Sequence, residues 1–420
     1  MRKLPLKKLL LIPVAGLLCL LVLAVLAIGL FQSRDRELFE RHQPYSEPWQ
    51  FDYASGSFNN YIDYARRRIT AARVEPLAPD QLDKLSPSIL MPEADCPLTE
   101  EGLYPNGIVI THGLFDSPYS MSDIAAYFHS QCFYVQVLLL PDHGTRPGDM
   151  LVTQWQQWVL AEHFATRTLA EKVRTVYVSG HSVGGALSVH EAATNPDVDA
   201  LIAYAPALAI SGAAKYAKFI ALIGKLFPKA AWLDVKPDNA SYRYESFTLA
   251  SAAQTWELTR HVQEVLEQRP LTVPAFIIAS MEETTVSAPA IVSLMESNRH
   301  GASRNLLYSR HSVEVADPIE VFISRDEDAG ILSLSHLGLM TSPEHPEYGR
   351  NGNYRYCGHY RGDDDASYRA CMNGQRDFYG EITDENRQRG VIERIAFNPY
   401  YAGLLQRMEQ FIAEVSALQQ

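Results

Sequence analysis

The sequence predicts an α/β protein in which a mostly parallel central sheet is covered by helices on both faces. The first observation is a series of short apolar runs of the kind that buried parallel strands show, at 107–113, 133–140, 175–180, 200–207 and 275–280. The second is that helical patterns lie between the strand-like runs, most clearly at 154–172 and 184–195. Because strands and helices alternate, consecutive strands are expected to pair in parallel through helical crossovers.

Three regions do not follow this alternation. Residues 32–103 contain seven prolines and are expected to form an irregular leading segment, after which the main domain spans 104–420. Residues 208–268 carry amphipathic patterns between two expected strands, which is the place for an inserted helical cap. Residues 350–390 are polar and rich in Gly and Tyr, and we expect an extension whose role the sequence does not indicate.

The N-terminal residues 1–31 predict a cytoplasmic tip followed by a transmembrane anchor. Residues 9–31 carry no charge, and a helix of that length crosses a hydrocarbon core of roughly 30 Å. Basic residues precede this stretch, so the catalytic domain is expected on the periplasmic side of the inner membrane. A cleaved signal peptide is the alternative, because Ala27-Ile28-Gly29 has small residues at cleavage spacing.

Four cysteines follow the anchor, namely Cys96, Cys132, Cys357 and Cys371. An even number beyond a membrane permits two disulfides, with three possible connectivities. Pairing between neighbours in the sequence, Cys96 with Cys132 and Cys357 with Cys371, is our prediction. Reduced, buried thiols are the alternative.

Composition and missing motifs exclude several classes of protein. The net charge is −12 and no dense basic block is present, which argues against a nucleic-acid partner. We find no Gly-rich phosphate loop or dinucleotide fingerprint, so no cofactor is expected. The acidic run in 362–367 is expected to be a solvated loop, and no metal site is predicted.

The run "TVYVSGHSVGGALS" at 175–188 contains the candidate nucleophile, Ser182. Its motif, Gly180-His181-Ser182-Val183-Gly184, lies between an apolar strand and a helical pattern, where small residues permit a sharp turn that exposes a serine hydroxyl. The N–H of Val183 opens the helix and is expected to stabilise an oxyanion. The alternative is a structural strand-to-helix turn with a capping serine.

A second oxyanion donor is expected from the loop after an earlier strand. His112-Gly113 end the run "GIVITHG", which places the N–H of Leu114 for this role. His112 itself is expected to support the loop by hydrogen bonding rather than act as a base.

Four motifs in order, "THGLFDSPYSM", "LPDHGTRPGDM", "WQQW" and "GHSVGG", resemble the α/β-hydrolase branch that holds monoacylglycerol lipases, carboxylesterases and serine-aminopeptidase-like enzymes, in its membrane-anchored bacterial form. The resemblance covers about 104–345 and is weakest across the cap. Asp142 stands where that branch usually has Gly, and Val183 stands where Met is common. The resemblance implies an α/β-hydrolase fold with a helical cap.

The resemblance also implies a Ser, acid, His order along the chain. Its acid usually stands in Asp-x-x-Val, which Glu283-Thr-Thr-Val286 matches with Glu in place of Asp. The histidine loop matches "SLSHLGL", which favours His336. The alternatives left open are Glu282, Asp326 and Asp328 for the acid, and His311 and His345 for the base.

We therefore expect a serine hydrolase that cleaves acyl esters, such as a monoacylglycerol or a lysophospholipid, through Ser182, Glu283 and His336. An aminopeptidase is an alternative, because Asp234, Asp238 and Glu245 in the cap suit a free α-amine. A thioesterase or acyltransferase would use the same triad. A catalytically decayed, membrane-tethered binding module is the alternative from another class.

Overall fold

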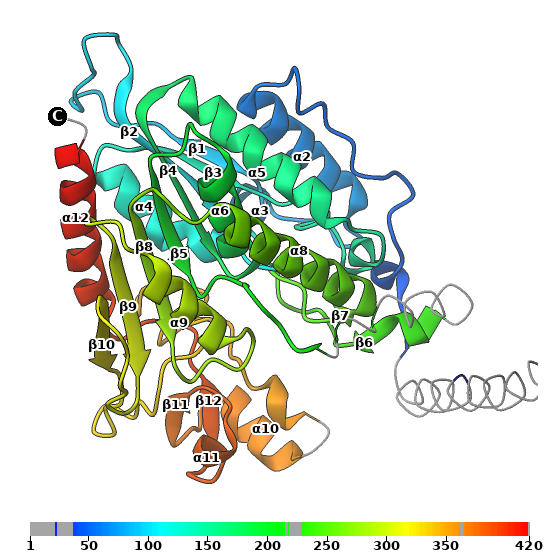
Figure 1. Cartoon of the computed structure of the whole chain (residues 1–420). Helices are drawn as coiled ribbons and strands as arrows, with labels where there is room; N and C mark the ends of the chain where they lie inside the picture. Colours follow the sequence, from blue (N-terminus) through cyan, green and yellow to red (C-terminus); the bar gives the residue numbers. More distant parts are fainter. Residues whose placement is uncertain are drawn as a thin grey trace, which may run out of the picture.

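The computed structural model describes residues 22, 37–212, 214, 217, 228–361 and 364–418 (Figure 1). The predicted anchor at 9–31 lies outside these residues apart from Val22. Within the described ranges, no helix combines the length and the apolar character needed to cross a membrane.

One eight-stranded sheet forms the centre of the molecule, in the order β1-β3-β2-β4-β5-β8-β9-β10. All neighbouring pairs are parallel except β1 with β3. The strands are β1 (Ser88–Leu90), β2 (Tyr104–Thr111), β3 (Tyr134–Leu138), β4 (Val173–His181), β5 (Ala200–Tyr204), β8 (Ala275–Ser280), β9 (Arg304–Ser309) and β10 (Ile319–Ile323). The predicted mostly parallel α/β sheet is therefore present, with β1, β9 and β10 added at its edges.

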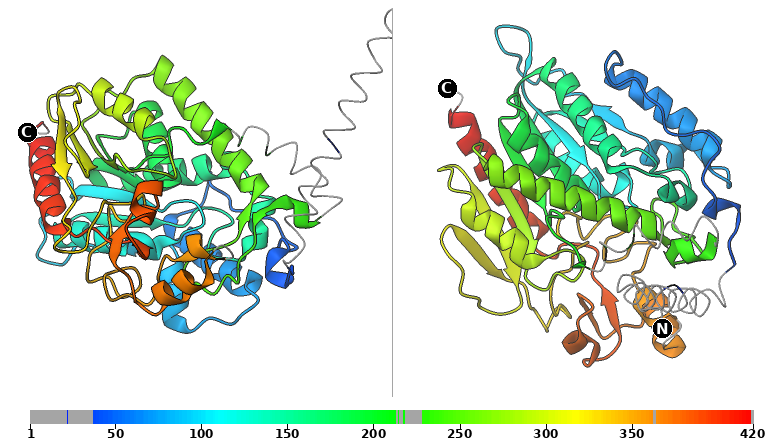
Figure 2. Two further views of the ribbon diagram at one scale, coloured as in Figure 1. Left: turned by 90° about the horizontal axis from the view of Figure 1, so that it is seen from below. Right: turned by 45° about the vertical axis from the view of Figure 1, so that its right-hand side comes forward.

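Helices cover both faces of this sheet (Figures 1 and 2). One layer contains α5 (Trp155–Ala170), α6 (Val183–Thr194), α8 (Leu249–Gln268) and α9 (Ala288–Ser297). The other contains α4 (Ser122–Ser130) and α12 (Tyr401–Leu418), which are joined by a hydrogen bond from Tyr127 Oη to the Leu405 carbonyl. Buried side chains of the central strands pack into both layers, which is why these strands are apolar along most of their length.

The leading segment differs from the sequence expectation, because it contains helices α2 (Phe58–Ala72) and α3 (Pro79–Leu85). The prolines stand outside the body of α2, whose N-cap Ser57 accepts a hydrogen bond from the Asn60 N–H. Its buried face, including Tyr61 and Ile69, joins the main core. The prediction of an irregular segment was wrong here because prolines break a helix only where they interrupt it.

The C-terminal part of the expected cap, 208–268, also differs from the sequence expectation. Its described part holds η5 (Pro228–Ala231) and the two-stranded sheet of β6 (Trp232–Asp234) and β7 (Phe247–Thr248), while 218–227 lies outside the described residues. Helix α8, which we expected in the cap, packs against α5 and α6, and its Leu258 and Val262 are part of the main core. The end of the 208–268 region therefore belongs to the helical layer on the sheet.

The extension contains short elements, and each disulfide joins the cysteines that we predicted. The elements are η6 (Gly358–Tyr360), α10 (Asp365–Met372), β11 (Phe378–Gly380), α11 (Asp384–Arg387) and β12 (Ile392–Arg394). Cys357 and Cys371 are bonded within this extension, and Cys96 and Cys132 are bonded beside β3. Three more single turns complete the described chain: η1 (Glu40–His42), η2 (Pro118–Met121) and η3 (Pro147–Leu151).

Candidate active site

Ser182 stands at the corner between β4 and α6 with φ 56° and ψ −114°, a conformation that non-glycine residues rarely adopt. A Cβ added to Gly180 would lie 2.3 Å from the Gly184 backbone, and one added to Gly184 would lie 2.3 Å from the Thr111 carbonyl oxygen. Only glycine allows β2, β4 and α6 to approach so closely. This close approach forms the sharp corner that puts Ser182 in the wall of a cavity.

Two backbone N–H groups lie beside Ser182. Val183 is the first residue of α6, so its N–H has no acceptor within the helix. The N–H of Leu114 makes no backbone hydrogen bond within the described part of the chain. Leu114 and Val183 line the same cavity as Ser182, and a Cβ on Gly113 would lie 3.2 Å from the Ser182 Cβ. Both predicted oxyanion donors therefore stand next to the serine.

His112 supports the loop that carries Leu114 through two hydrogen bonds to the backbone. The Leu140 N–H donates to His112 Nε2 over 3.1 Å, so Nδ1 carries the proton and donates to the Gly113 carbonyl over 2.8 Å. Burial lowers the pKa of His112 well below its usual value, which keeps the ring neutral. The geometry gives His112 a supporting position and no contact with His336.

Asp142, for which the resemblance implies Gly at this position of the motif, has φ 66°. This left-handed conformation explains the preference for Gly, and Asp is one of the residues that tolerate it. Burial raises the pKa of Asp142 to about 7.

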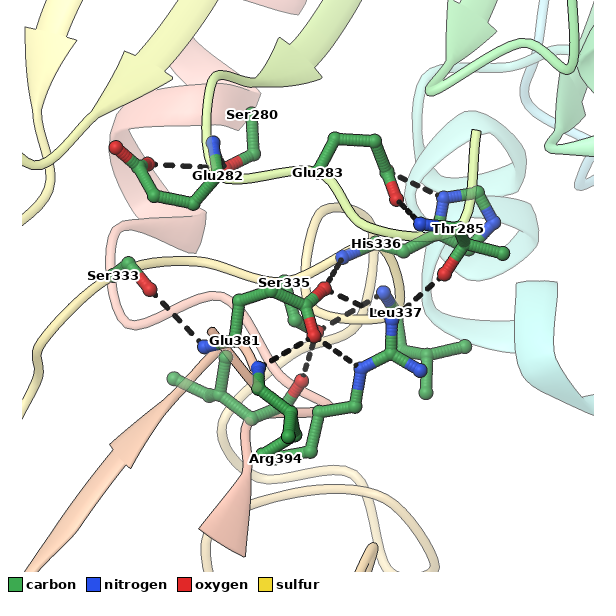
Figure 3. Close-up of polar contacts among 12 residues, drawn as sticks. Ser280, Glu282, Glu283, Thr285, Ser333, Ser335, His336, Leu337, Glu381 and Arg394 are labelled. Carbon is green, nitrogen blue, oxygen red and sulfur yellow. Dashed lines mark hydrogen bonds and ion pairs between the residues drawn. The ribbon is translucent and has the colours of Figure 1, made fainter. Parts of the chain in front are cut away.

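Glu283 and His336 are joined by a hydrogen bond of 2.6 Å between Glu283 Oε2 and His336 Nδ1 (Figure 3). Burial alone would raise the pKa of Glu283, but the charge and the hydrogen bond of His336 outweigh it and lower the pKa to about 2. An ionised carboxylate only accepts, so Nδ1 carries the proton and Nε2 is left as a base. The N–H groups of Thr285 and Val286 donate to Glu283 Oε1 over 2.6 and 3.3 Å, which fixes the carboxylate.

His181 brings the His336 loop next to the serine. Its Nε2 donates to the His336 carbonyl over 3.0 Å, and the two ring centroids are 4.6 Å apart. His336 and Ser182 line one cavity, although in the described ranges no hydrogen bond joins their side chains. Such contacts often tighten only when substrate is bound.

The residues that the sequence left open as alternative acids or bases lie away from the contact between Glu283 and His336. Glu282 points away from His336 in Figure 3 and accepts a hydrogen bond of 3.1 Å from the Arg310 N–H. Asp326 accepts from the Ala329 N–H in an exposed turn that also holds Asp328, and His311 follows strand β9. His345 Nε2 contacts the Ser122 hydroxyl over 3.2 Å. None of these five side chains contacts His336 or Ser182 in the contacts described.

A buried ion pair from the extension supports both loops that carry Glu283 and His336. Glu381, whose side chain is 0% exposed, accepts from Arg394 Nε over 2.7 Å and from Arg394 Nη2 over 2.9 Å (Figure 3). The His336 N–H also donates to Glu381 over 3.3 Å, and Arg394 donates to the Thr285 hydroxyl over 2.8 Å. Sequence reasoning missed this pair, because neither residue stands in a motif.

The cavity has a volume of about 1390 Å³ and extends from Ser182 beneath the cap and the extension. The three cap carboxylates that suited a free amine are already in contact with other groups. Asp234 lies 3.6 Å from Lys236 Nζ, and Asp238 contacts His42 over 3.3 Å. Glu245 accepts from the Tyr354 hydroxyl over 2.9 Å. No group of three or more possible metal-ligating side chains is found in the searched ranges 37–212, 228–361 and 364–418, which omit two residues of the acidic run.

The fold and the site define an α/β hydrolase with a serine at its nucleophile position. Residues 106–310 match the family model described as serine aminopeptidase, S33. A thermostable monoacylglycerol lipase from Bacillus sp. (strain H-257) is 26% identical over 220 residues, which are 50% of this chain and 84% of that protein.

Two solved structures are also similar over part of the chain. A metagenome-derived lipolytic enzyme has 25% identity over 47% of this chain and 81% of its own, with a TM-score of 0.40. The monoacylglycerol lipase of Paleococcus ferrophilus has 17% identity over 53% of this chain and 88% of its own, also with a TM-score of 0.40. The family match and the curated relative, together with the fold, make this chain a serine ester hydrolase.

Proposed function

We propose that this enzyme hydrolyses acyl esters, such as a monoacylglycerol or a lysophospholipid, through Ser182, His336 and Glu283. The observation that carries the proposal is the 2.6 Å bond between His336 Nδ1 and the ionised Glu283, in the same cavity as a serine on a strained strand-to-helix turn. A base oriented by a carboxylate and placed near a serine is the arrangement that acyl transfer requires.

In the proposed mechanism, His336 Nε2 takes the proton of Ser182 as Oγ attacks the carbonyl carbon of the ester. The Leu114 and Val183 N–H groups stabilise the negative oxygen of the tetrahedral intermediate. His336 then returns the proton to the leaving alcohol, and an acyl-enzyme remains on Ser182. Water, deprotonated by the same histidine, releases the carboxylic acid and restores the serine.

The substrate class is supported by the relatives and by the cavity. The similar protein from Bacillus sp. is named a monoacylglycerol lipase. The cavity wall contains apolar side chains, among them Phe115, Leu233 and Phe247, which suit an acyl chain.

We further propose that residues 9–31 anchor the enzyme in the inner membrane, with the hydrolase domain on the periplasmic side. The uncharged apolar stretch supports the anchor. Two disulfides in the domain support an oxidising compartment. Carbonate extraction of membranes and protease accessibility in spheroplasts test this; a chain that carbonate releases would contradict it.

The catalytic proposal is tested with the full-length chain and p-nitrophenyl esters of increasing acyl length. Ser182→Ala and His336→Ala are expected to abolish turnover, and Ser182→Ala is expected to abolish labelling by a fluorophosphonate. Glu282→Ala is the control for Glu283→Ala, because it removes the neighbouring carboxylate that does not contact His336. Wild-type enzyme that neither turns over esters nor labels would refute the proposal and favour the decayed binding module.

Aminopeptidase activity is a second candidate, because the matching family model is described by that activity. Hydrolysis of aminoacyl p-nitroanilides beside the esters decides between them. The engagement of Asp234, Asp238 and Glu245 with other groups favours the ester.

A further inference from the structure

Five cationic side chains line the cavity that contains Ser182: Lys236, Arg243, Arg355, Arg361 and Arg394. Three of them form ion pairs with carboxylates, Lys236 with Asp234, Arg355 with Glu393 and Arg394 with Glu381, at 3.6, 3.1 and 2.7 Å. Arg361 is exposed, so bulk water hydrates it. Arg243 is half-buried, and in the described part of the chain no carboxylate forms an ion pair with it.

The surroundings of Arg243 are aromatic. Its Nη1 donates to the Tyr356 hydroxyl, and its guanidinium lies 4.8 Å from the Tyr356 ring centre and 5.9 Å from that of Tyr354. Its Nε is buried without a hydrogen-bond partner. Among the described contacts, Nη2 has no acceptor either. Two of the three nitrogens, which carry three of the five N–H donors, therefore have no acceptor in the described contacts.

One carboxylate, Asp116, acts on Arg243 through space without pairing with it. Asp116 is buried and accepts a hydrogen bond of 3.0 Å from the Ser117 N–H. Burial raises the pKa of Asp116, and the positive charge of Arg243 only partly opposes this. In the described contacts Asp116 makes neither an ion pair nor a hydrogen bond with Arg243, so it does not complete the hydrogen-bond shell of the guanidinium.

The backbone around Arg243 is held firmly against the oxyanion loop. The Tyr244 N–H donates to the Phe115 carbonyl over 2.7 Å, one residue beyond Leu114. On the other side, Arg73 donates to the Ser241 carbonyl over 3.1 Å, and the rings of Tyr242 and Tyr119 are 4.5 Å apart. Arg243 therefore lines the cavity from a pre-organised segment that is hydrogen-bonded to the loop of Leu114.

A cation withdrawn from water is unfavourable unless an anion and hydrogen-bond acceptors complete its shell. We propose that Arg243 binds an anionic group, a carboxylate or a phosphate, that the ester substrate carries. Both groups present paired oxygens that match the planar fork of a guanidinium. The inference rests on the proposed esterase function and narrows it, since a lysophospholipid with its phosphate fits and a neutral monoacylglycerol does not use this group.

The test compares pairs of esters that differ in one anionic group, with full-length wild-type enzyme and Arg243→Met. The carboxylate pair is mono-p-nitrophenyl adipate beside p-nitrophenyl hexanoate, and the phosphate pair is 1-oleoylglycerol 3-phosphate beside 1-oleoylglycerol. Charge-assisted hydrogen bonds of this kind predict that Arg243→Met lowers the anionic-to-neutral ratio of kcat/KM by about ten- to a hundredfold. The pair whose ratio falls identifies the anion.

Arg361→Met is the matched control, because it removes the same charge from the wall of the same cavity at an exposed position. For Arg361→Met, the anionic-to-neutral ratio of kcat/KM is expected to change less than about twofold. Arg243→Lys keeps the charge without the planar fork, and it is expected to give an intermediate ratio of kcat/KM. If Arg243→Met does not fold, Arg243→Lys is used in its place. An unchanged ratio in folded Arg243 variants overturns the inference while the esterase function stands, whereas wild-type enzyme that cleaves none of the four esters refutes the esterase function itself.

Discussion

Replacing Glu381 by Gln is expected to impair catalysis although this residue is not one of the proposed triad. Four N–H donors converge on its carboxylate: two from Arg394, one from Ile382 and one from His336. Gln has a single acceptor oxygen and introduces a donor, so part of these donors lose their acceptor. Arg394 then loses the charge that holds it against Thr285 in the loop of Glu283.

The size of the expected loss of stability in Glu381→Gln follows from how deeply the ion pair is buried. The Glu381 side chain is 0% exposed and that of Arg394 is 21% exposed. Removing one partner of a buried ion pair destabilises a protein by about 3–5 kcal/mol. Because Arg394 can still reach some water, we expect the free energy of unfolding to fall by about 3 kcal/mol, toward the lower end of that range. Since the His336 and Glu283 loops both lose a contact, kcat is expected to fall at least about tenfold with KM nearly unchanged.

The assay is urea unfolding together with steady-state ester kinetics and the rate of fluorophosphonate labelling, all on the same preparations. Glu327→Gln is the matched control, because Glu327 likewise forms ion pairs with arginine, in this case Arg325 and Arg389, but at an exposed position. It is expected to leave kcat unchanged. If Glu381→Gln loses stability while kcat and the labelling rate remain at wild-type values, the pair is purely structural and the reasoning is refuted.

Three further predictions follow from the site and the core. Glu283→Asp is expected to retain more activity than Glu283→Gln, because only the carboxylate can orient and charge-stabilise His336; equal kcat values in the two variants would contradict this. Burial raises the pKa of Glu162 to about 8 from 4.5, so the folded state keeps a proton that the unfolded chain has lost, and stability falls as the pH rises through this window. Urea unfolding from pH 4.5 to 8 should therefore show a smaller loss in Glu162→Gln than in wild type, and parallel curves would be inconsistent with a protonated Glu162. Gly184→Ala, whose Cβ would lie 2.3 Å from the Thr111 carbonyl oxygen, is expected to lose about 3 kcal/mol or fail to fold, whereas Gly301→Ala, which meets nothing within 4 Å, should unfold at a similar urea concentration to wild type.

Local patterns predicted much of the fold and the position of Ser182 at a strand-to-helix corner. The strands around Ser182 were evident because strands buried on both faces must be apolar, and the structure places them as β2, β3, β4, β5 and β8. The corner at Ser182 was evident because a sharp turn between a strand and a helix needs glycine on both sides of the serine. Helix α2 was missed, since proline content was counted over the whole leading segment rather than at the positions that a helix would occupy.

The sequence alone did not decide which carboxylate contacts His336. Glu283 was identified only through its resemblance to a motif, and Glu282 differs from it by one position. The backbone turn decides between them: it directs Glu283 at His336 and Glu282 at the Arg310 N–H. Adjacent side chains in an extended or turning segment point in different directions, and that direction depends on how the loop is held.

By itself the sequence determined the class of fold and the serine at the strand-to-helix corner, because both depend on neighbouring residues and on backbone sterics. Only the tertiary structure decided which charges are paired. Glu381 reaches the His336 backbone across 45 residues, and Arg394 reaches Thr285 across 109. Arg243 has no such carboxylate partner in the described chain, although nothing in its sequence surroundings distinguishes it from Arg355 or Arg394. Whether a charge finds a partner depends on which distant segments the fold brings within a few ångströms and on how much water remains there, and no local pattern encodes that.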